Sequence, residues 1–283
     1  MEILRIPRIM QETSKRLIQQ GKSIGFVPTM GALHNGHLSL LKRARDENAV
    51  VVASIFVNPL QFGANEDLNK YPRDLEGDIE KLKAEQTNIL FLPDAKSLYP
   101  DTFQTYVSVS ELSEKLCGAF RPEHFRGVTT VVNKLFNIVK PHRAYFGQKD
   151  YQQFVIIKKM VADLNMDIEV IACSTIREND GVAMSSRNIY LSPDERKAAE
   201  IINKCLLFAS QSLQSGESNL SAIKQRMSDM LKGEPLVSEV QYAGIYDPDS
   251  LDELKEIKRQ NLLAIALKIG NTRLIDNMLV DVL

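Results

Sequence analysis

Short apolar segments alternate with amphipathic segments through the first 175 residues of this 283-residue chain. The segments predicted to be strands are residues 23–27, 49–57, 88–92, 143–146 and 168–172. The segments predicted to be helices, from the spacing of their apolar residues, are 36–47, 74–85, 127–139 and 151–164. Apolar strands separated by amphipathic helices are typical of a parallel sheet that is covered on both faces. We therefore predict an α/β fold with a Rossmann-like parallel sheet and helices on both faces.

The alternation ends near residue 176, which predicts a smaller α+β domain at the C-terminal end. Ser192 and Glu195 form a capping box, with Pro193 at the first helical position, and a long helix should follow. Three apolar runs come later, at residues 239–245, 262–269 and 273–282. A short glycine-containing turn joins the last two runs, which predicts a hairpin. The expected domains are residues 1–175 and 176–283.

Charge and cysteine content limit the partners that we expect. The chain has 35 lysine and arginine residues and 36 aspartate and glutamate residues, so its formal net charge is −1. A broad nucleic-acid surface is not expected at this balance, and neither a signal peptide nor a membrane-spanning run is evident. Cys117, Cys173 and Cys205 are scattered, which favours reduced, buried thiols over a disulfide framework or a metal cluster. We expect a cytoplasmic protein without nucleic-acid or membrane partners.

The segment 28–37, with the sequence PTMGALHNGH, joins the first predicted strand to the next helix. Asn35 is the expected N-cap, which places His34 and His37 at the first helical turn. Free backbone N–H groups and the helix dipole favour an anion at this position. Two imidazoles there offer neutral-to-cationic donors to a triphosphate.

Two other interpretations of the histidine pair remain open at this point. The imidazoles can be ordinary polar side chains on a loop, and a His-x-x-His pair by itself favours that interpretation. A zinc site would need a third ligand, and the neighbouring sequence does not supply one. The chain also lacks the two glycine-rich phosphate motifs, Gly-x-x-x-x-Gly-Lys-Ser/Thr and Gly-x-Gly-x-x-Gly. If it binds a nucleotide, the histidine segment must provide the site.

Side-chain amides follow the second predicted strand. Asn58 and Gln61 could recognise hydroxyl and carboxylate groups of a small substrate. The alternative is that Asn58 and Pro59 only form a turn.

The segment 146–153 repeats the strand–loop–helix arrangement. Gly147 permits close approach of a ligand, and Lys149 can meet a phosphate. Asp150 can cap the helix, or it can hold a ribose hydroxyl or magnesium. Gln153 is either a ligand contact or the capping-box partner of Asp150, and its spacing does not decide between the two.

A third polar segment lies at residues 183–188. Ser185, Ser186 and Arg187 place two hydroxyls and a guanidinium on a loop, which suits an anion. The preceding residues 177–181 are expected to form an exposed, mobile turn, so that the loop could act as a lid. The alternative is a solvated surface turn.

Four sequence blocks together resemble the pantothenate synthetase (pantoate–β-alanine ligase) family. They are PTMGALHNGH at 28–37, FVNPLQFG at 56–63, FGQKDYQQ at 146–153 and MSSRN at 184–188. The resemblance covers nearly the whole chain, including residues 271–277. The His-x-Gly-His element is shared with the wider nucleotidylyltransferase and class I aminoacyl-tRNA synthetase group, whereas the other three blocks are specific to this family.

The resemblance implies a two-step ligase. The carboxylate of (R)-pantoate attacks the α-phosphorus of ATP and gives pantoyl adenylate and pyrophosphate. The amine of β-alanine then attacks the acyl carbon and displaces AMP, giving pantothenate, the coenzyme A precursor. Mg²⁺ is expected to accompany ATP, no metal ligands are assigned on the protein, and a homodimer is implied.

The resemblance also implies the residues of the site. His37 would be catalytic, as a proton donor or charge stabiliser. Gln61 would contact pantoate and β-alanine, and Gln153 would contact pantoate. Arg121 and His124 match a further block and would either serve the site or order the loop. ATP binding is implied for Met30, Gly31, Ala32, Leu33, His34, Asn35, Gly36 and His37, for Gly147, Gln148, Lys149 and Asp150, for the backbone of Ile176, and for Met184, Ser185, Ser186 and Arg187.

Two rival functions can be distinguished from the ligase. A simple nucleotidylyltransferase would need a pocket for the phosphate of its acceptor, whereas this chain offers amides at Asn58, Gln61 and Gln153. A non-catalytic ATP-sensing module would have little use for both His37 and an acceptor pocket. Pyrophosphate release that depends on pantoate would separate the three.

Overall fold

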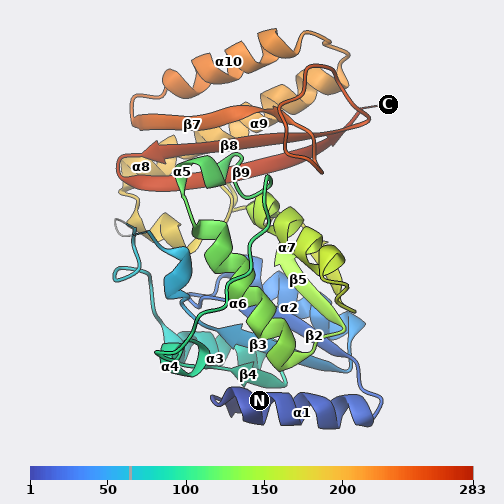
Figure 1. Cartoon of the computed structure of the whole chain (residues 1–283). Coiled ribbons are helices and arrows are strands. Elements are labelled where there is room, and N and C mark those ends of the chain that lie inside the picture. The colour runs from blue at the N-terminus through green and yellow to red at the C-terminus, as the bar shows by residue number, and fades with distance from the viewer. Residues whose placement is uncertain (64–65, 283) are drawn as a thin grey trace.

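Two β-sheets organise the molecule, which a computed structural model describes over residues 1–63 and 66–282 (Figure 1). Within these residues the first sheet is parallel, with the strand order β1-β4-β3-β2-β5-β6. Its strands are β1 (Glu2–Leu4), β2 (Ile24–Thr29), β3 (Val50–Ile55), β4 (Ile89–Phe91), β5 (Arg143–Gly147) and β6 (Glu169–Cys173). The prediction of a Rossmann-like parallel sheet is therefore confirmed.

Helices cover both faces of this sheet. One face packs against α1 (Pro7–Gln19), α6 (His124–Val139) and α7 (Tyr151–Asp163), and the other against α2 (Asn35–Glu47) and α3 (Leu75–Ala84). Successive strand residues point to opposite faces, so Phe26 is buried in the first core and Val27 in the second. Strands buried on both sides account for the continuous apolar runs in the sequence.

The strand order reverses next to β2. The chain adds β3 and β4 on one side of β2, and later β5 and β6 on the other side. The carboxyl ends of β2 and β5 therefore border the crevice where α/β sheets usually bind ligands. Residues 30–37 follow β2, and the 3-10 helix η2 (Gln148–Asp150) follows β5.

The second sheet is antiparallel, with the order β7-β8-β9, and consists of β7 (Val237–Tyr246), β8 (Gln260–Ile269) and β9 (Thr272–Asp281). β8 and β9 form the predicted hairpin. One face packs against α9 (Glu200–Gln214) and α10 (Leu220–Lys232), at the top of Figure 1. On the other face, Tyr246 and Leu262 pack against Tyr151 and Val155 of α7.

The predicted helix start at Ser192 is confirmed, but two helices follow it in place of one long helix. The reciprocal hydrogen bonds of the capping box join Ser192 and Glu195. The chain then forms α8 (Pro193–Ala198) and α9 on either side of Ala199. The division into domains at residue 176 stays a prediction.

The sequence did not reveal the first two elements, β1 and α1. β1 is a three-residue edge strand, and the N-cap residue of α1, Ile6, makes no side-chain cap. The shorter elements are η1 (Pro59–Gln61), α4 (Ala95–Leu98), α5 (Cys117–Phe120) and η3 (Ser186–Tyr190).

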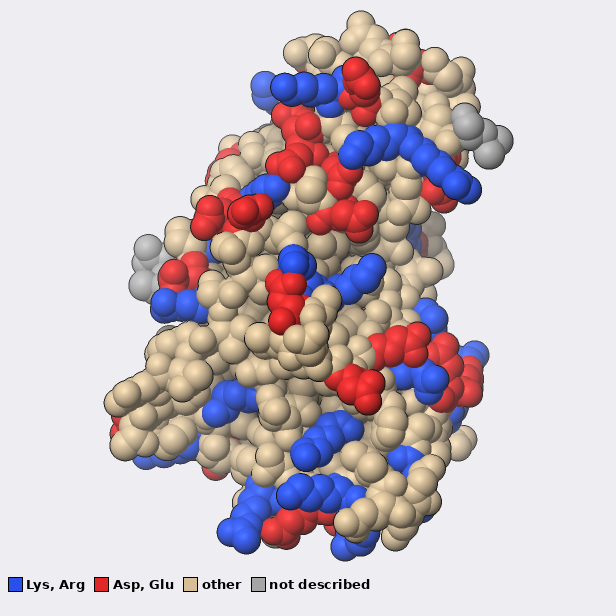
Figure 2. All heavy atoms as spheres, turned by 45° about the vertical axis from the view of Figure 1, so that its right-hand side comes forward, with Lys and Arg blue, Asp and Glu red and all other residues tan. Residues whose placement is uncertain are grey.

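Among the helices that the structure describes, none is both long and apolar enough to cross a membrane. Basic and acidic side chains are interspersed on the face drawn in Figure 2.

Candidate active site

A cavity of about 1020 Å³ is lined by residues from the carboxyl-end loops of the parallel sheet and from the C-terminal sheet. The predicted substrate contacts that line it are Lys149, Asp150, Gln153, Ser185 and Arg187. The remaining predicted contacts, which are residues 30–37, Gln61, Gly147, Gln148, Ile176, Met184 and Ser186, are outside the lining that the described residues form. The structure thus gathers part of the predicted site directly around one cavity, and the contacts of several of the other residues are described below.

The N-cap of α2 is His34, and the prediction of Asn35 is wrong. His34 has extended backbone angles, and its Nδ1 accepts a hydrogen bond from the backbone nitrogen of Gly36 at 3.1 Å. The Nδ1 of His37 accepts from the backbone nitrogen of His34 at 3.3 Å, which completes a capping box. An imidazole nitrogen can replace the usual Ser, Thr, Asp or Asn acceptor at this position, so the usual preference was misleading here.

These bonds determine the tautomer of both histidines. Each Nδ1 is an acceptor, so in the neutral ring the proton must be on Nε2. Burial lowers the pKa of His34 to about 4, with Lys149 contributing. Burial, followed by the neighbouring His34, lowers the pKa of His37 to about 3. The two rings, 4.1 Å apart between centroids, are therefore neutral Nε2–H donors at pH 7.

Asp78 of α3, which was not among the predicted site residues, holds the loop before the histidines. Its carboxylate accepts from the backbone nitrogens of Ala32 at 2.8 Å and Leu33 at 2.7 Å. Gly31 has a φ of +84°, and a Cβ there would come within 2.9 Å of Asp78 Oδ2. The signal in the sequence was a carboxylate on the buried side of an amphipathic helix, where charged residues need partners.

Gln61 lies in η1 and contacts the segment that follows β2. Its side-chain nitrogen is 3.3 Å from the sulfur of Met30, and its Oε1 accepts from the Nδ2 of Asn58 at 3.0 Å. Asn58 also accepts from the backbone nitrogen of Leu60 and from the hydroxyl of Tyr99. Asn58 therefore does form a turn, and it also orients Gln61.

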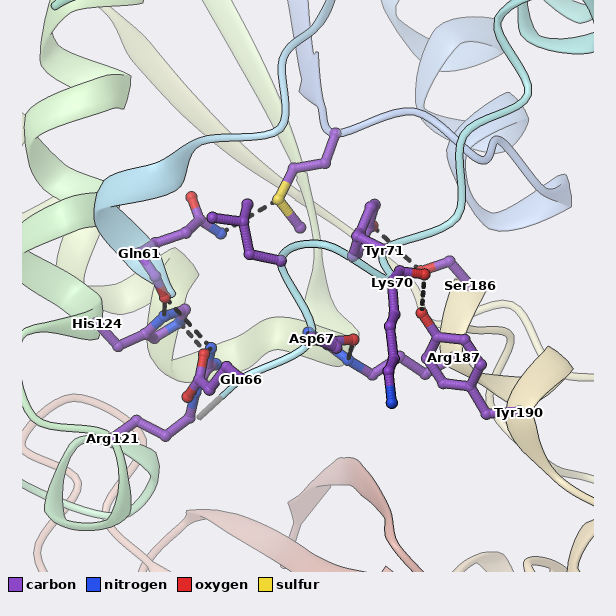
Figure 3. Close-up of polar contacts among 12 residues, drawn as sticks. Gln61, Glu66, Asp67, Lys70, Tyr71, Arg121, His124, Ser186, Arg187 and Tyr190 are labelled. Atoms are coloured by element: carbon purple, nitrogen blue, oxygen red, sulfur yellow. Dashed lines mark hydrogen bonds and ion pairs between the residues drawn. The ribbon is translucent and has the colours of Figure 1, made fainter. Parts of the chain in front are cut away.

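Arg121 and His124 order the segment that carries Gln61 (Figure 3). The carbonyl of Gln61 accepts from Nδ1 of His124 at 2.8 Å, which leaves Nε2 as the acceptor for Arg121 at 3.0 Å. Burial, followed by Arg121, lowers the pKa of His124 to about 4, as this neutral tautomer requires. Arg121 also forms a two-pronged ion pair with Glu66 at 2.7 and 2.6 Å. Both residues line the cavity.

Arg187 is already paired with a carboxylate, which the sequence analysis did not anticipate. Its guanidinium donates to both oxygens of Asp67, at 3.0 and 2.9 Å. The hydroxyls of Ser186 and Tyr71 lie 3.2 Å apart, and Tyr190 donates to the carbonyl of Lys70 at 2.9 Å. Figure 3 shows these contacts joining residues 66–71 to η3. The loop that contains Ser185, Ser186 and Arg187 is thus held by residues 67–71.

The hydrogen bonds at the start of α7 bear on whether Gln153 is a capping-box partner or a ligand contact. Asp150 occupies the N-cap position without a side-chain cap, and Gln153 makes no side-chain hydrogen bond to any described residue. The capping-box interpretation is therefore not supported. The neighbouring Gln152 is the structural amide, because it binds the backbone of Leu112, Lys115 and Cys117.

The turn at 177–181 is only partly exposed. Arg177 pairs with Asp276, and Arg196 pairs with both Glu178 and Asp180. Met184 at the far end of this turn approaches the histidine segment, because a Cβ on Gly36 would be 4.0 Å from the Cβ of Met184. Asn179 and Asp180 at the tip are exposed as expected, whereas ion pairs hold the rest of the turn to neighbouring elements, and its mobility stays a prediction.

Comparison with known proteins identifies the family. The model of the pantoate–β-alanine ligase family matches residues 2–279. A pantothenate synthetase of Thermodesulfovibrio yellowstonii is 61% identical over 281 residues, which is 99% of this chain and 100% of that protein. The chain belongs to the pantoate–β-alanine ligase family.

Solved structures of pantoate–β-alanine ligases share the fold. Pantothenate synthetase of Thermus thermophilus is 42% identical with a TM-score of 0.94, over 98% of this chain and 99% of that one. The ligase of Francisella tularensis, solved with β-γ ATP and β-alanine, is 37% identical with a TM-score of 0.81, over 99% and 97%.

The structure shows no preformed metal centre within residues 1–63 and 66–282. In these ranges no group of three or more His, Cys, Asp or Glu side chains could hold an ion. Asp150 is a carboxylate in the cavity lining next to Lys149. A single carboxylate suits Mg²⁺ that is bound mainly by phosphates and water.

Proposed function

We infer that the chain joins (R)-pantoate to β-alanine with ATP, producing pantothenate, AMP and pyrophosphate through pantoyl adenylate. The observation that carries this conclusion is the family match over residues 2–279. The cavity at the carboxyl-end loops after β5 and β6, lined by amide, hydroxyl and cationic side chains, supports it.

The adenylation step is proposed to take place beside the histidine segment. An already ionised pantoate carboxylate needs no general base. It attacks the α-phosphorus, a new P–O bond forms, and the bond to pyrophosphate breaks. We propose that His37 stabilises the charge on the phosphate oxygens as a neutral Nε2–H donor, with His34 beside it. Lys149 would supply the positive charge that a neutral imidazole lacks.

The acyl-transfer step needs an acceptor pocket. The amine of β-alanine attacks the acyl carbon of the adenylate, an amide bond forms, and AMP leaves with the electron pair of the broken C–O bond. We propose that Gln61 and Gln153 hold pantoate, and that Gln61 also contacts β-alanine. The free side chain of Gln153 in the cavity lining and the contact between Gln61 and Met30 support this placement.

The proposed phosphate contacts of Arg187 compete with its ion pair to Asp67. Asp67 already accepts from Nε and Nη2, so a phosphate can use the full set of guanidinium donors only after Asp67 is displaced. We propose that ATP replaces Asp67, and that Ser185 and Ser186 move with Arg187, whereas Met184 keeps its backbone hydrogen bond to Ile176. Mg²⁺ would be bound by the phosphates and water, with Asp150 available as a carboxylate. Homodimer formation and cytoplasmic residence stay predictions from the family resemblance.

Product release in stages tests the function. ATP and pantoate without β-alanine should release pyrophosphate in a burst of about one equivalent per site, and AMP should appear only after β-alanine is added. A nucleotidylyltransferase or an ATP sensor would show no pantoate-dependent burst. A strict requirement for β-alanine before any pyrophosphate forms would contradict the free adenylate.

A further inference from the structure

Two adjacent residues of β9 reach from the C-terminal sheet to the loops of the parallel sheet. Asp276 and Asn277 are 4% and 5% exposed, and both belong to the cavity lining. Neither has a role in the function proposed above. Their partners are the backbone after β5 and the first side chain of the turn after β6, the two places where ATP contacts are proposed.

Asn277 clamps the turn after β5. Its side-chain nitrogen donates to the carbonyl oxygens of Gln148 at 2.9 Å and Lys149 at 2.8 Å. Both carbonyls are acceptors only, so the amide must point its NH₂ group at the turn. The opposite atom, Oδ1, is buried and has no partner among the described residues. One side chain thereby sets the position of the backbone that carries Lys149.

Asp276 holds the base of the turn that leads to Met184. Its carboxylate accepts from Arg177 at 2.5 and 3.1 Å, and also from the backbone nitrogen of Asn277 at 2.8 Å. Arg177 in turn donates to the carbonyl of Gly181 at 3.0 Å. The backbone nitrogen of Met184 donates to the carbonyl of Ile176 at 3.0 Å, so the two limbs of the turn are held together.

We propose that Asp276 and Asn277 are positioning residues for ATP, which hold the turn at 148–150 and the turn at 176–184 in one fixed relation. The inference rests on the proposed ATP contacts of those two segments. β5 and β6 are adjacent parallel strands, but their loops leave the sheet independently. A single dipeptide from the other sheet connects them, and displacing a catalytic group by about 1 Å can cost a hundredfold in rate.

The test replaces the amide of Asn277 without changing its size. Asn277→Asp puts an oxygen in place of the nitrogen that faces the two carbonyl groups. Asn261→Asp is the matched control, because Asn261 on β8 is also buried and its side-chain nitrogen donates to the carbonyls of Lys258 and Val280. Asn261 is not among the residues that line the cavity. Steady-state kinetics for ATP and for pantoate, with melting curves, are measured for both.

We expect Asn277→Asp to lower kcat/KM for ATP tenfold to a hundredfold, mainly through KM, and to leave KM for pantoate within about threefold. Asn261→Asp should lower the melting temperature without this selective effect. If Asn277→Asp does not fold, Asn277→Ala is measured in its place. It removes the donor without adding repulsion, and it should also raise KM for ATP.

A double-mutant cycle then asks whether Asn277 acts through the turn. When Lys149 is already alanine, Asn277→Ala should have a smaller effect on ATP use than in the unmodified protein, because coupled residues are not additive. Equal effects on both backgrounds, an unchanged KM for ATP, or the same loss in the Asn261 control would overturn the proposal. A failure of the proposed function is recognised separately, because the unmodified protein would then release no pyrophosphate with pantoate.

Discussion

At the scale of single residues, the hydrogen-bond partners of a side chain determine its tautomer and which of its donors and acceptors stay available to a ligand. The two histidines of the α2 start are the clearest case, since each Nδ1 already accepts from a backbone nitrogen. They are therefore neutral donors, and the positive charge that we propose beside them comes from Lys149, which lines the cavity. Gln152 and Gln153 differ in the same way, because the first is saturated with backbone partners and the second is free.

His37→Ala should slow adenylate formation by about 10²–10⁴ because a fixed imidazole donor is lost. His37→Asn is the companion variant, since its Oδ1 can still accept from the backbone nitrogen of His34 and preserve the helix start. Pantoate-dependent ATP–pyrophosphate exchange is the measurement, with thermal melting as control. Near-normal exchange in a folded variant would remove His37 from the mechanism.

Gln153→Ala should weaken pantoate use about ten- to a hundredfold, which corresponds to the ~1–3 kcal/mol lost with a buried hydrogen-bond partner. Its melting temperature and its KM for ATP should hardly change, because Gln153 bonds to no described residue. Gln152→Ala should show the reverse pattern, with lower stability from three lost backbone contacts. If Gln153→Ala keeps normal pantoate kinetics, the acceptor pocket lies elsewhere.

At the scale of elements, loops are held by partners on other elements. Asp78 of α3 supports the loop after β2, and Asn58 in front of η1 orients Gln61. Gly127 lets α6 approach η1, since a Cβ there would lie 2.3 Å from the carbonyl oxygen of Leu60. The same principle applies to η3, whose Arg187 is held by Asp67.

Asp67→Asn should lower KM for ATP several-fold, because Arg187 would no longer have to leave a carboxylate before it meets a phosphate. Glu66→Gln is the control, since it loosens the same segment by releasing Arg121 and leaves the pair between Asp67 and Arg187 intact. Steady-state titration of ATP at saturating pantoate distinguishes them. A higher KM in Asp67→Asn would mean that Asp67 supports the ATP-bound form instead.

At the scale of the whole molecule, the cavity exists only where the two sheets meet. Its lining combines Lys149 and Gln153 from the loop and helix after β5 with Asp276 and Asn277 from β9. The molecule also buries three neutral imidazoles, because burial lowers the pKa of His34 and His124 to about 4 and of His37 to about 3. Protonation of these rings therefore favours the unfolded chain over the folded one.

Stability should fall as the pH is lowered from 7 to 5. Unfolded histidines titrate near pH 6.5, so below that pH the unfolded chain binds more protons than the folded one, and the free energy of unfolding decreases. The loss is up to about 2 kcal/mol for each such histidine between pH 7 and 5. Denaturant titrations at both pH values measure it, and His124→Gln should reduce the difference. Equal stability at pH 5 and 7 would show that these rings are not held neutral.

The sequence by itself determined the parallel sheet, the later hairpin and the strand ends where the polar segments lie, because apolar periodicity and turn residues are local properties. It also contained the four blocks that indicate the family. It could not indicate β1, which is short and stabilised by pairing with β4, or the His34 cap, which contradicts the usual residue preference. Asp78, Asp67 and the pair Asp276–Asn277 act on partners 45 to 129 residues away in the chain. Only the tertiary structure decided those contacts, because packing of distant elements brings each donor to its acceptor.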